Sequence, residues 1–369
     1  MVKILFFIET LEGGGAEKVL RNLVNNMDQS RFDITVQTVW PCEFEKYLVK
    51  GIKHKSLYSS RNSANQMRYR IEAATGLAYK LHIKDDYDIE CAYLECGATK
   101  IMAASTNKNA KKLAWVHCDL QKAMSNPKAF AEQTKAYYAK FDKVICVSEK
   151  VRDSFVELFG NTVSAEVLYN TVDDEEICNK AAMPLPDGTK MPPMTVVSLG
   201  RLSPPKNYMR LLRAHKRLLD EGIYHNLWIL GEGPEREMLE QYIAENGIED
   251  TAKLLGFKQN PYPYLREADL LVCSSDYEGF STFVTEGVIL GKPIVTTDCT
   301  GMREILGNSE FGLVTELDDE AFYEGMKKML SDSSLRKRYE EKSAIRGRDF
   351  SAHTLAEKTE KYFEELINK

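Results

Sequence analysis

The sequence has no apolar run long enough to cross a membrane. Its N-terminal apolar run, Ile4 to Ile8, is far shorter than the ~20 residues that a membrane helix needs. The long apolar core and small-residue cleavage site of a secretory signal are also missing. We therefore expect a cytoplasmic protein. The 369 residues, 43% hydrophobic and 28% charged, are typical of a soluble chain with two domains.

Motifs for disulfides and metal sites are missing as well. None of the eight cysteines forms a CxxC pair, and the six histidines include no HExxH pattern. Several cysteines lie inside strand-like apolar runs, so we expect reduced, mostly buried thiols rather than a disulfide framework or a zinc site. The sequence therefore offers no evident metal site.

Positive charge is concentrated in one segment. The net charge of −6 argues against general nucleic-acid binding. Lys46 to Lys84 nevertheless contains nine basic residues and a single acid, Glu72. This segment is either an ordinary solvated face or a surface for an acidic partner such as an anionic membrane.

Alternating strand-like and helical patterns predict an α/β fold. The first series opens with the apolar run Lys3–Ile8, then Gly13, Gly14 and Gly15, then apolar residues at helical spacing. Strand, glycine turn and helix form the first unit of a doubly wound domain. Further strands are expected at Asp33–Val39, Ile89–Tyr93, Lys112–Val116 and Lys143–Val147, and helices near 66–83, 97–106, 128–140 and 149–158.

A second series of strands and helices follows residues 181–193, whose prolines and glycine predict an interdomain linker. Residues 1–180 would form one domain and 194–350 the other, with the amphipathic segment 351–369 packing back onto the first. Two Rossmann-like domains with parallel sheets facing across a cleft are thus expected. Strands of the second series are expected at Thr195–Leu199, Asn226–Leu230, Ala252–Leu255, Leu270–Cys273 and Pro293–Thr296, and helices near 207–221, 234–246, 261–267, 282–290 and 319–330.

Two cations follow the first strand of this second series. Arg201 and Lys206 lie between the strand and the next helix, at the edge where open α/β sheets bind ligands. Arginine binds phosphate oxygens through a planar fork, and lysine binds them as a point charge. The pair is either a diphosphate site or two surface bases.

Two glutamates flank a predicted helix start further along the chain. Glu278 and Gly279 precede Phe280, Ser281 or Thr282 is the expected N-cap, and Glu286 lies inside the helix. The first amides of a helix and its dipole favour an anionic group. Glu286 lies about 7.5 Å along the helix from Ser281, a suitable reach from phosphate to ribose. Glu278 would then hold hydroxyls of a sugar at the other end. A capped surface helix with two solvated acids is the alternative.

Weaker signals lie at other strand ends. Gly233 follows a strand where a backbone must approach a ligand closely, and Phe257 could frame a nucleotide base through main-chain contacts. In the first domain, Gly13, Gly14 and Gly15 permit similar close approach, or form a plain turn. They are neither GxGxxG nor GxxxxGK, so dinucleotide and P-loop sites lack their fingerprints. His117 follows an apolar run, where it would bond a sugar hydroxyl or position the reacting centre.

Taken together, these motifs resemble family 4 of the glycosyltransferases, retaining enzymes of the GT-B fold. The resemblance covers essentially the whole chain and is carried by Gly200-Arg201-Leu202 with Lys206, Gly231-Glu-Gly-Pro234, Glu278 with Glu286, Gly291-Lys-Pro, and Tyr169-Asn170. It implies that Arg201 and Lys206 bind the diphosphate, Glu278 the transferred sugar and Glu286 the ribose. Gly13, Gly14, Gly15 and His117 would lie near donor and acceptor. Asn207 stands where glycine is common, Ser281 where a second glycine is common, and Gly287 in a usual Ala-x-Ala run.

The resemblance implies metal-independent transfer of a hexose from a nucleoside diphosphate sugar, UDP by default, with no cofactor beyond that co-substrate. The acceptor would be a glycan or lipid-linked sugar of bacterial capsule, exopolysaccharide or lipopolysaccharide. Residues 46–84 would then contact the inner face of the plasma membrane. Two alternatives remain open: another GT-B enzyme, such as a sugar-nucleotide epimerase or a phosphorylase-like enzyme, and a GT-B subunit that binds sugar nucleotide without turnover.

Overall fold

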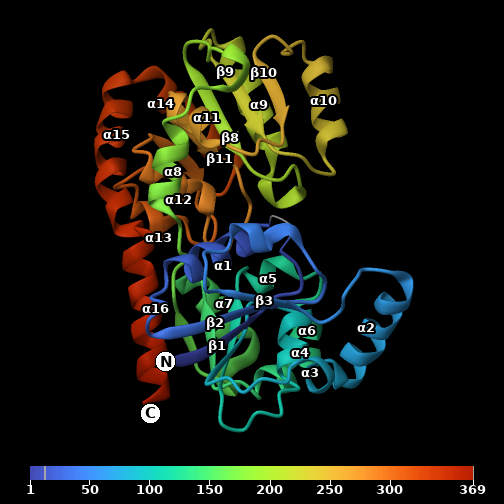
Figure 1. Cartoon of the computed structure of the whole chain (residues 1–369). Helices are drawn as coiled ribbons and strands as arrows, with labels where there is room; N and C mark the ends of the chain where they lie inside the picture. Colours follow the sequence, from blue (N-terminus) through green and yellow to red (C-terminus); the bar gives the residue numbers. More distant parts are fainter. Residues whose placement is uncertain (12–13, 369) are drawn as a thin grey trace. The chain divides into compact units, whose positions relative to one another are not determined.

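The computed structural model describes residues 1–11 and 14–368, and the predicted site residue Gly13 lies outside them. The chain divides into two compact units (Figure 1). The N-terminal unit comprises Met1–Thr171 and the segment from Ala352 onward, and the C-terminal unit comprises Val172–Ser351.

The N-terminal unit is built on a seven-stranded sheet in which every strand pair is parallel. The strand order is β3-β2-β1-β4-β5-β6-β7, with a crossover on each side of β1. The strands are β1 (Val2–Phe7), β2 (Phe32–Thr38), β3 (Lys53–Ser56), β4 (Ile89–Ala92), β5 (Lys111–Val116), β6 (Lys143–Cys146) and β7 (Ala165–Val167). Ile4 to Ile8 are fully buried, as expected for a parallel strand covered on both faces.

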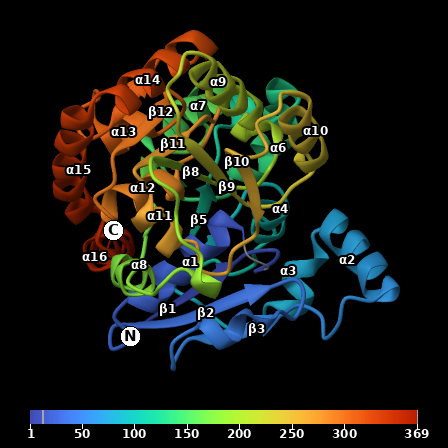
Figure 2. The same ribbon diagram turned by 90° about the horizontal axis from the view of Figure 1, so that it is seen from above.

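Eight helices accompany this sheet in the described part of the unit. The C-terminal helix α16 packs on α1. Glu360 of α16 pairs with Arg31 at 2.9 Å, and Phe363 of α16 contacts Phe6 of β1. α2 projects from the body of its unit in both views (Figures 1 and 2). The helices are α1 (Gly15–Asn26), α2 (Ser63–Thr75), α3 (Leu77–His82), α4 (Gly97–Met102), α5 (Leu120–Ala123), α6 (Pro127–Tyr138), α7 (Glu149–Phe159) and α16 (Ala352–Ile367).

The C-terminal unit repeats the design with a six-stranded parallel sheet in the order β10-β9-β8-β11-β12-β13. Its strands are β8 (Thr195–Leu199), β9 (Asn226–Leu230), β10 (Ala252–Gly256), β11 (Leu270–Cys273), β12 (Ile294–Thr297) and β13 (Leu313–Thr315). Its helices are α8 (Asp174–Ala181), α9 (Tyr208–Asp220), α10 (Arg236–Glu245), α11 (Tyr262–Glu267), α12 (Thr282–Ile289), α13 (Met302–Leu306), α14 (Asp319–Ser331) and α15 (Ser333–Gly347). The predicted α/β class with two parallel sheets is confirmed.

The division between the units differs from the boundary expected at 180. It falls after Thr171, and the expected linker, 181–193, is part of the C-terminal unit. The reason is the packing of α8 on α11 and α12. Asn260 donates to the carbonyl of Lys180 at 3.1 Å, and Arg266 donates to that of Ala181 at 3.4 Å.

The cysteines fit the expectation only in part. All eight are free thiols, and Cys91, Cys146, Cys273 and Cys299 are buried. Cys96 and Cys178 are exposed, so the expectation of mostly buried thiols is wrong for these two.

Candidate active site

Two loops of the C-terminal unit carry most of the predicted site residues. β8 pairs with β11, so the loops that follow these two strands start side by side at one edge of the sheet. The first loop contains Arg201 and Lys206, and the second contains Glu278. The Ser274 hydroxyl donates to the carbonyl of Lys206 at 2.8 Å, and the Asp276 amide donates to that of Pro205 at 2.8 Å. The two segments therefore lie next to each other at one edge of the sheet.

Lys206 and Glu278 form an ion pair across these loops, with 2.5 Å between Nζ and Oε1. The Ser275 hydroxyl donates to the same carboxylate oxygen at 2.8 Å. Burial works against the charge on Lys206, but the carboxylate of Glu278 outweighs it and raises the pKa of Lys206. Both side chains keep some exposure, 23% and 14%, so a ligand can reach a fixed cation and a fixed carboxylate here.

Arg201 extends from the same loop and is exposed. Within residues 1–11 and 14–368 it has no salt-bridge partner, in contrast to Lys206. Its five guanidinium donors are thus available for an anionic ligand, for which a planar fork is well suited.

The predicted helix start is confirmed at α12. The Ser281 hydroxyl caps the helix by accepting from the amide of Val284 at 3.5 Å, and Thr282 is the first helical residue. Glu286 lies in the helix interior and is 2% exposed. The next residue, Gly287, packs closely on the sheet. A Cβ at this position would lie 2.8 Å from the side chain of Leu271 and 2.9 Å from that of Ile294. This close helix–sheet contact explains the residue that replaces the usual alanine.

Glycine turns line the same sheet edge. Gly231 has φ +143°, and a Cβ there would lie 1.9 Å from the carbonyl oxygen of Gly200. A Cβ on Gly233 would lie 2.1 Å from the carbonyl oxygen of Leu202. Packing between neighbouring loops therefore already requires both glycines, independently of any ligand. Phe257 follows β10 and is 74% exposed, and its predicted contact with a base remains a prediction.

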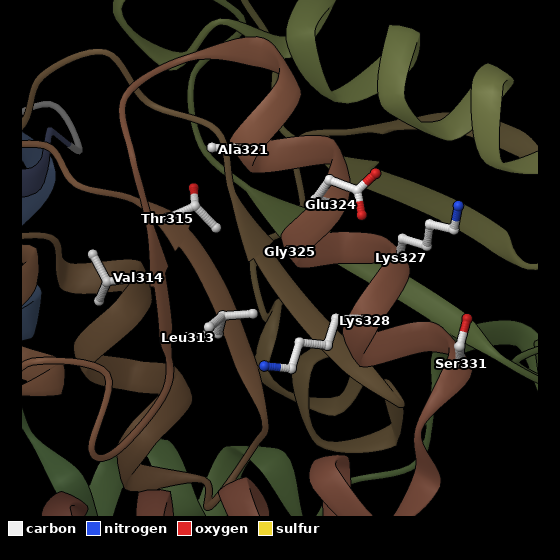
Figure 3. Close-up of a pocket in the computed structure, with 9 residues that line it drawn as sticks. All are labelled: Leu313, Val314, Thr315, Ala321, Glu324, Gly325, Lys327, Lys328 and Ser331. Carbon is white, nitrogen blue, oxygen red and sulfur yellow. The ribbon is translucent and has the colours of Figure 1, made fainter.

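A pocket of about 590 Å³ lies elsewhere in the C-terminal unit, between the edge strand β13 and α14 (Figure 3). Leu313 and Thr315 of β13 line it opposite Gly325, and Glu324 and Lys328 extend from α14. It contains none of the predicted site residues. The candidate site is thus defined by the two loops rather than by this pocket.

In the N-terminal unit, His117 directly follows β5, as predicted. Its ring lies 4.9 Å from that of Tyr93, and burial lowers the pKa of His117 to about 3, so the imidazole is neutral at physiological pH. Its Nε2 atom is buried and has no hydrogen-bond partner among the described residues. A neutral imidazole can donate to or accept from a hydroxyl, but it supplies no positive charge.

Sequence reasoning missed the carboxylate that holds this loop. Glu95 is 7% exposed and accepts from the amide of His117, and from that of Cys118 at 2.9 Å. Burial raises the pKa of Glu95. Its place just beyond the apolar run 89–93, where open sheets bind ligands, was the available signal.

A second missed carboxylate, Glu17, lies in the first turn of α1. Glu17 accepts from the amide of Gly14 at 2.6 Å and from the Thr10 hydroxyl at 2.7 Å. Gly14 is the N-cap of α1, and Gly15 is its first residue. A Cβ on Gly15 would meet no atom within 4 Å, so packing does not require glycine there.

Comparison with known families agrees with this geometry. Residues 13–176 match the model of Glycosyltransferase Family 4, and residues 186–346 match that of Glycosyl transferases group 1. An N-acetylgalactosamine-N,N'-diacetylbacillosaminyl-diphospho-undecaprenol 4-alpha-N-acetylgalactosaminyltransferase of Campylobacter jejuni is 29% identical, covering 98% of this chain and 99% of the relative.

Two further proteins are similar. The lipopolysaccharide core biosynthesis glycosyltransferase LpsE of Rhizobium meliloti is 31% identical over 40% of this chain and 42% of its own. The crystal structure of Anabaena HepE in complex with UDP matches with a TM-score of 0.76 and 19% identity, covering 99% of this chain and all of that one.

The two parallel sheets and the similarity to the Anabaena structure show that the chain has the GT-B fold. Enzymes with this fold are divided among many families, so the family of this chain follows from the two matched family models. The chain belongs to glycosyltransferase family 4, the group 1 glycosyl transferases, and is a retaining enzyme.

Proposed function

We propose that the enzyme transfers an N-acetylhexosamine or other hexose from a UDP-sugar to a lipid-linked sugar during synthesis of a bacterial surface polysaccharide. The observation that carries this proposal is the Lys206–Glu278 ion pair, which joins the loop that also contains Arg201 to the loop that leads into α12. The choice of a lipid-linked acceptor is supported by the Campylobacter relative, whose name specifies N-acetylgalactosamine transfer to a diphospho-undecaprenol-linked sugar. The choice of UDP is supported by the similar Anabaena protein, whose structure was determined in complex with UDP.

The Lys206–Glu278 pair provides both kinds of group that a sugar nucleotide needs. In the free enzyme each side chain compensates the other's charge. A bound donor replaces this contact, because its diphosphate takes the Lys206 ammonium and its sugar hydroxyls take the Glu278 carboxylate. Glu286 then accepts from the ribose hydroxyls, one and a half turns into α12.

The reaction breaks the bond between the anomeric carbon and the diphosphate oxygen and forms a bond from that carbon to the acceptor oxygen. Lys206, Arg201 and the first amides of α12 stabilise the negative charge that develops on the leaving diphosphate. The leaving phosphate oxygen takes the acceptor's proton on the same face, which gives retention. In the N-terminal unit, the neutral His117 bonds a donor hydroxyl, and Gly14 and Gly15 let the substrates approach the backbone.

Contact with an anionic membrane is proposed for residues 46–84. Among the described residues no helix is long and apolar enough to span a bilayer. Met67 and Ile71 on α2 are 58% and 56% exposed, and Leu77 and Leu81 on α3 are 44% and 42% exposed. Basic side chains lie among them, a combination that binds anionic lipid surfaces.

The inner side of this segment is anchored to its unit, which leaves the apolar side chains exposed. The Tyr69 hydroxyl donates to Glu9, outside the segment, at 2.6 Å. Within the segment, the Tyr58 hydroxyl donates to Glu72 at 2.6 Å and holds α2 against the chain that precedes it. Flotation on vesicles with and without phosphatidylglycerol tests the contact. Met67→Asp with Ile71→Asp should abolish flotation, while Ile345→Asp, at an exposed position of the C-terminal unit, should not. Equal recovery of all three proteins would contradict the contact.

Product analysis tests the proposed reaction. The enzyme is incubated with UDP-N-acetylgalactosamine, UDP-N-acetylglucosamine, UDP-glucose or UDP-galactose, with and without an undecaprenyl-diphosphate-linked sugar. We expect a lipid product extended by one sugar, with UDP released in equal amount. A changed sugar nucleotide without acceptor would identify an epimerase, and binding without product from any donor would identify a non-catalytic subunit.

A further inference from the structure

Asn207 connects the two loops of the donor site. It has φ 44° and ψ 52°, a left-handed conformation that asparagine tolerates better than most residues with a side chain. Its side-chain oxygen accepts from the amide of Arg210 at 3.2 Å and so caps α9. Its side-chain nitrogen donates to both carboxylate oxygens of Asp276, at 3.2 and 3.1 Å. A glycine would allow the same backbone but would remove all of these bonds.

Arg210 makes a second connection to the same loop. Its side chain is 8% exposed, and Nη1 donates to Asp276 at 2.8 Å and to the carbonyl of Ser274 at 3.0 Å. Its Nε donates to Asp319 of α14 at 2.7 Å. The guanidinium therefore joins α9 to the β11–α12 loop on one side and to α14 on the other.

These bonds lie next to the residues that bind the donor in the proposed function. Asn207 directly follows Lys206, and Asp276 precedes Glu278 by two residues. The Asp276 carboxylate accepts from Asn207 and Arg210, so it is not free to draw Lys206 away from Glu278. When a diphosphate replaces Glu278 at Lys206, the Asn207–Asp276–Arg210 contacts stay in place and hold both backbones.

We propose that Asn207, Arg210 and Asp276 are positioning residues for sugar transfer. They act through Lys206 and Glu278, whose flexible side chains need a fixed backbone to meet the diphosphate and the sugar in one geometry. The inference rests on the proposed function, because it assigns these residues to the same donor site.

A cycle of UDP affinities, measured by isothermal titration calorimetry, tests this proposal. Lys206→Ala should weaken UDP binding at least tenfold in the wild-type background, because Lys206 is aimed at the diphosphate. In an Asp276→Asn background the same change should weaken binding less than threefold, because Lys206 is already misplaced. Asn207→Gly keeps the backbone conformation and serves as a second background, with the same expectation, if Asp276→Asn does not fold.

Asp319→Asn is the matched control, since it removes the other carboxylate bound to Arg210 without touching either loop. In the Asp319→Asn background, Lys206→Ala should again weaken UDP binding at least tenfold. The Tm of Asp319→Asn should resemble that of Asp276→Asn. An equal loss on Lys206→Ala in every background would overturn the positioning role and leave the proposed function intact. No loss on Lys206→Ala even in the wild-type protein would overturn both.

Discussion

At the residue scale, the proposed donor site combines side chains that the sequence identified with hydrogen-bond partners that it did not identify. Arg201 and Lys206 were predicted because they follow an apolar strand, and Glu278 and Glu286 because they flank a predicted helix start. The bonds that hold them come from residues distant in sequence, such as Ser274 with Lys206. Glu95 was missed for the same reason, since the amides from which it accepts lie more than twenty residues further along the chain. Glu17 is different, because it accepts from the amide of Gly14 only three residues before it.

The glycines of the site separate into those that packing requires and those that it does not. Gly15→Ala should leave Tm unchanged or slightly raised, because the new Cβ meets no atom within 4 Å and alanine favours a helix by about 1 kcal/mol over glycine. If the backbone at Gly15 contacts substrate, turnover should fall at least tenfold. Normal turnover in this variant would remove Gly15 from the site.

Gly231→Ala is the contrasting variant for the same measurements. Its Cβ would collide with the Gly200 carbonyl, and φ +143° is strained for any side chain. It should therefore lower Tm sharply, as expected for overpacking that adds backbone strain. Thermal unfolding of both variants distinguishes a glycine kept for packing from one kept for a ligand.

At the scale of elements, the missed strands share a position. β3 and β7 are the two edges of the first sheet, and β13 is an edge of the second. An edge strand is short and partly exposed, so it lacks the continuous apolar run by which the central strands were recognised. One helix expected near 66–83 is two, because Gly76 adopts φ +74° and ends α2. Glycine in that conformation is a common helix end.

A buried histidine pair between α9 and β9 predicts a pH-dependent stability. Nδ1 of His215 lies 2.8 Å from Nε2 of His225, and both residues are buried. Burial lowers the pKa of His215 to about 3 and also lowers that of His225. The unfolded chain, with a pKa near 6.5, then binds more protons than the folded one below pH 6.5, so stability falls as pH falls from about 6.5 toward 3.

Urea unfolding of the wild type and of His215→Gln between pH 7 and pH 4 measures this effect. The free energy of unfolding of the variant should fall by about 1.4 kcal/mol less per pH unit across the acidic range, because one buried group that binds a proton only on unfolding has been removed. His353→Gln, at a 79% exposed side chain, is the control and should keep the wild-type slope. Identical slopes for all three proteins would show that the buried pair does not titrate as argued.

At the scale of the whole molecule, the sequence predicted two parallel α/β domains and the return of the C-terminal helix to the first sheet. The predicted domain boundary at 180 was wrong because proline and glycine indicate only where helices and strands end. α8 belongs to the C-terminal unit because it packs on α11 and α12. The motifs of the sequence likewise specify the reaction class and not the sugar or the acceptor.

We propose that Lys206, which pairs with Glu278 in the free enzyme, binds the diphosphate of the donor. Calorimetric titration of the wild type and of Lys206→Ala with UDP and with uridine tests it most directly, because the two ligands differ only in the diphosphate. We predict that the wild type binds UDP at least a hundredfold more tightly than uridine and that Lys206→Ala reduces this ratio tenfold or more. An unchanged ratio in the variant would contradict the claim.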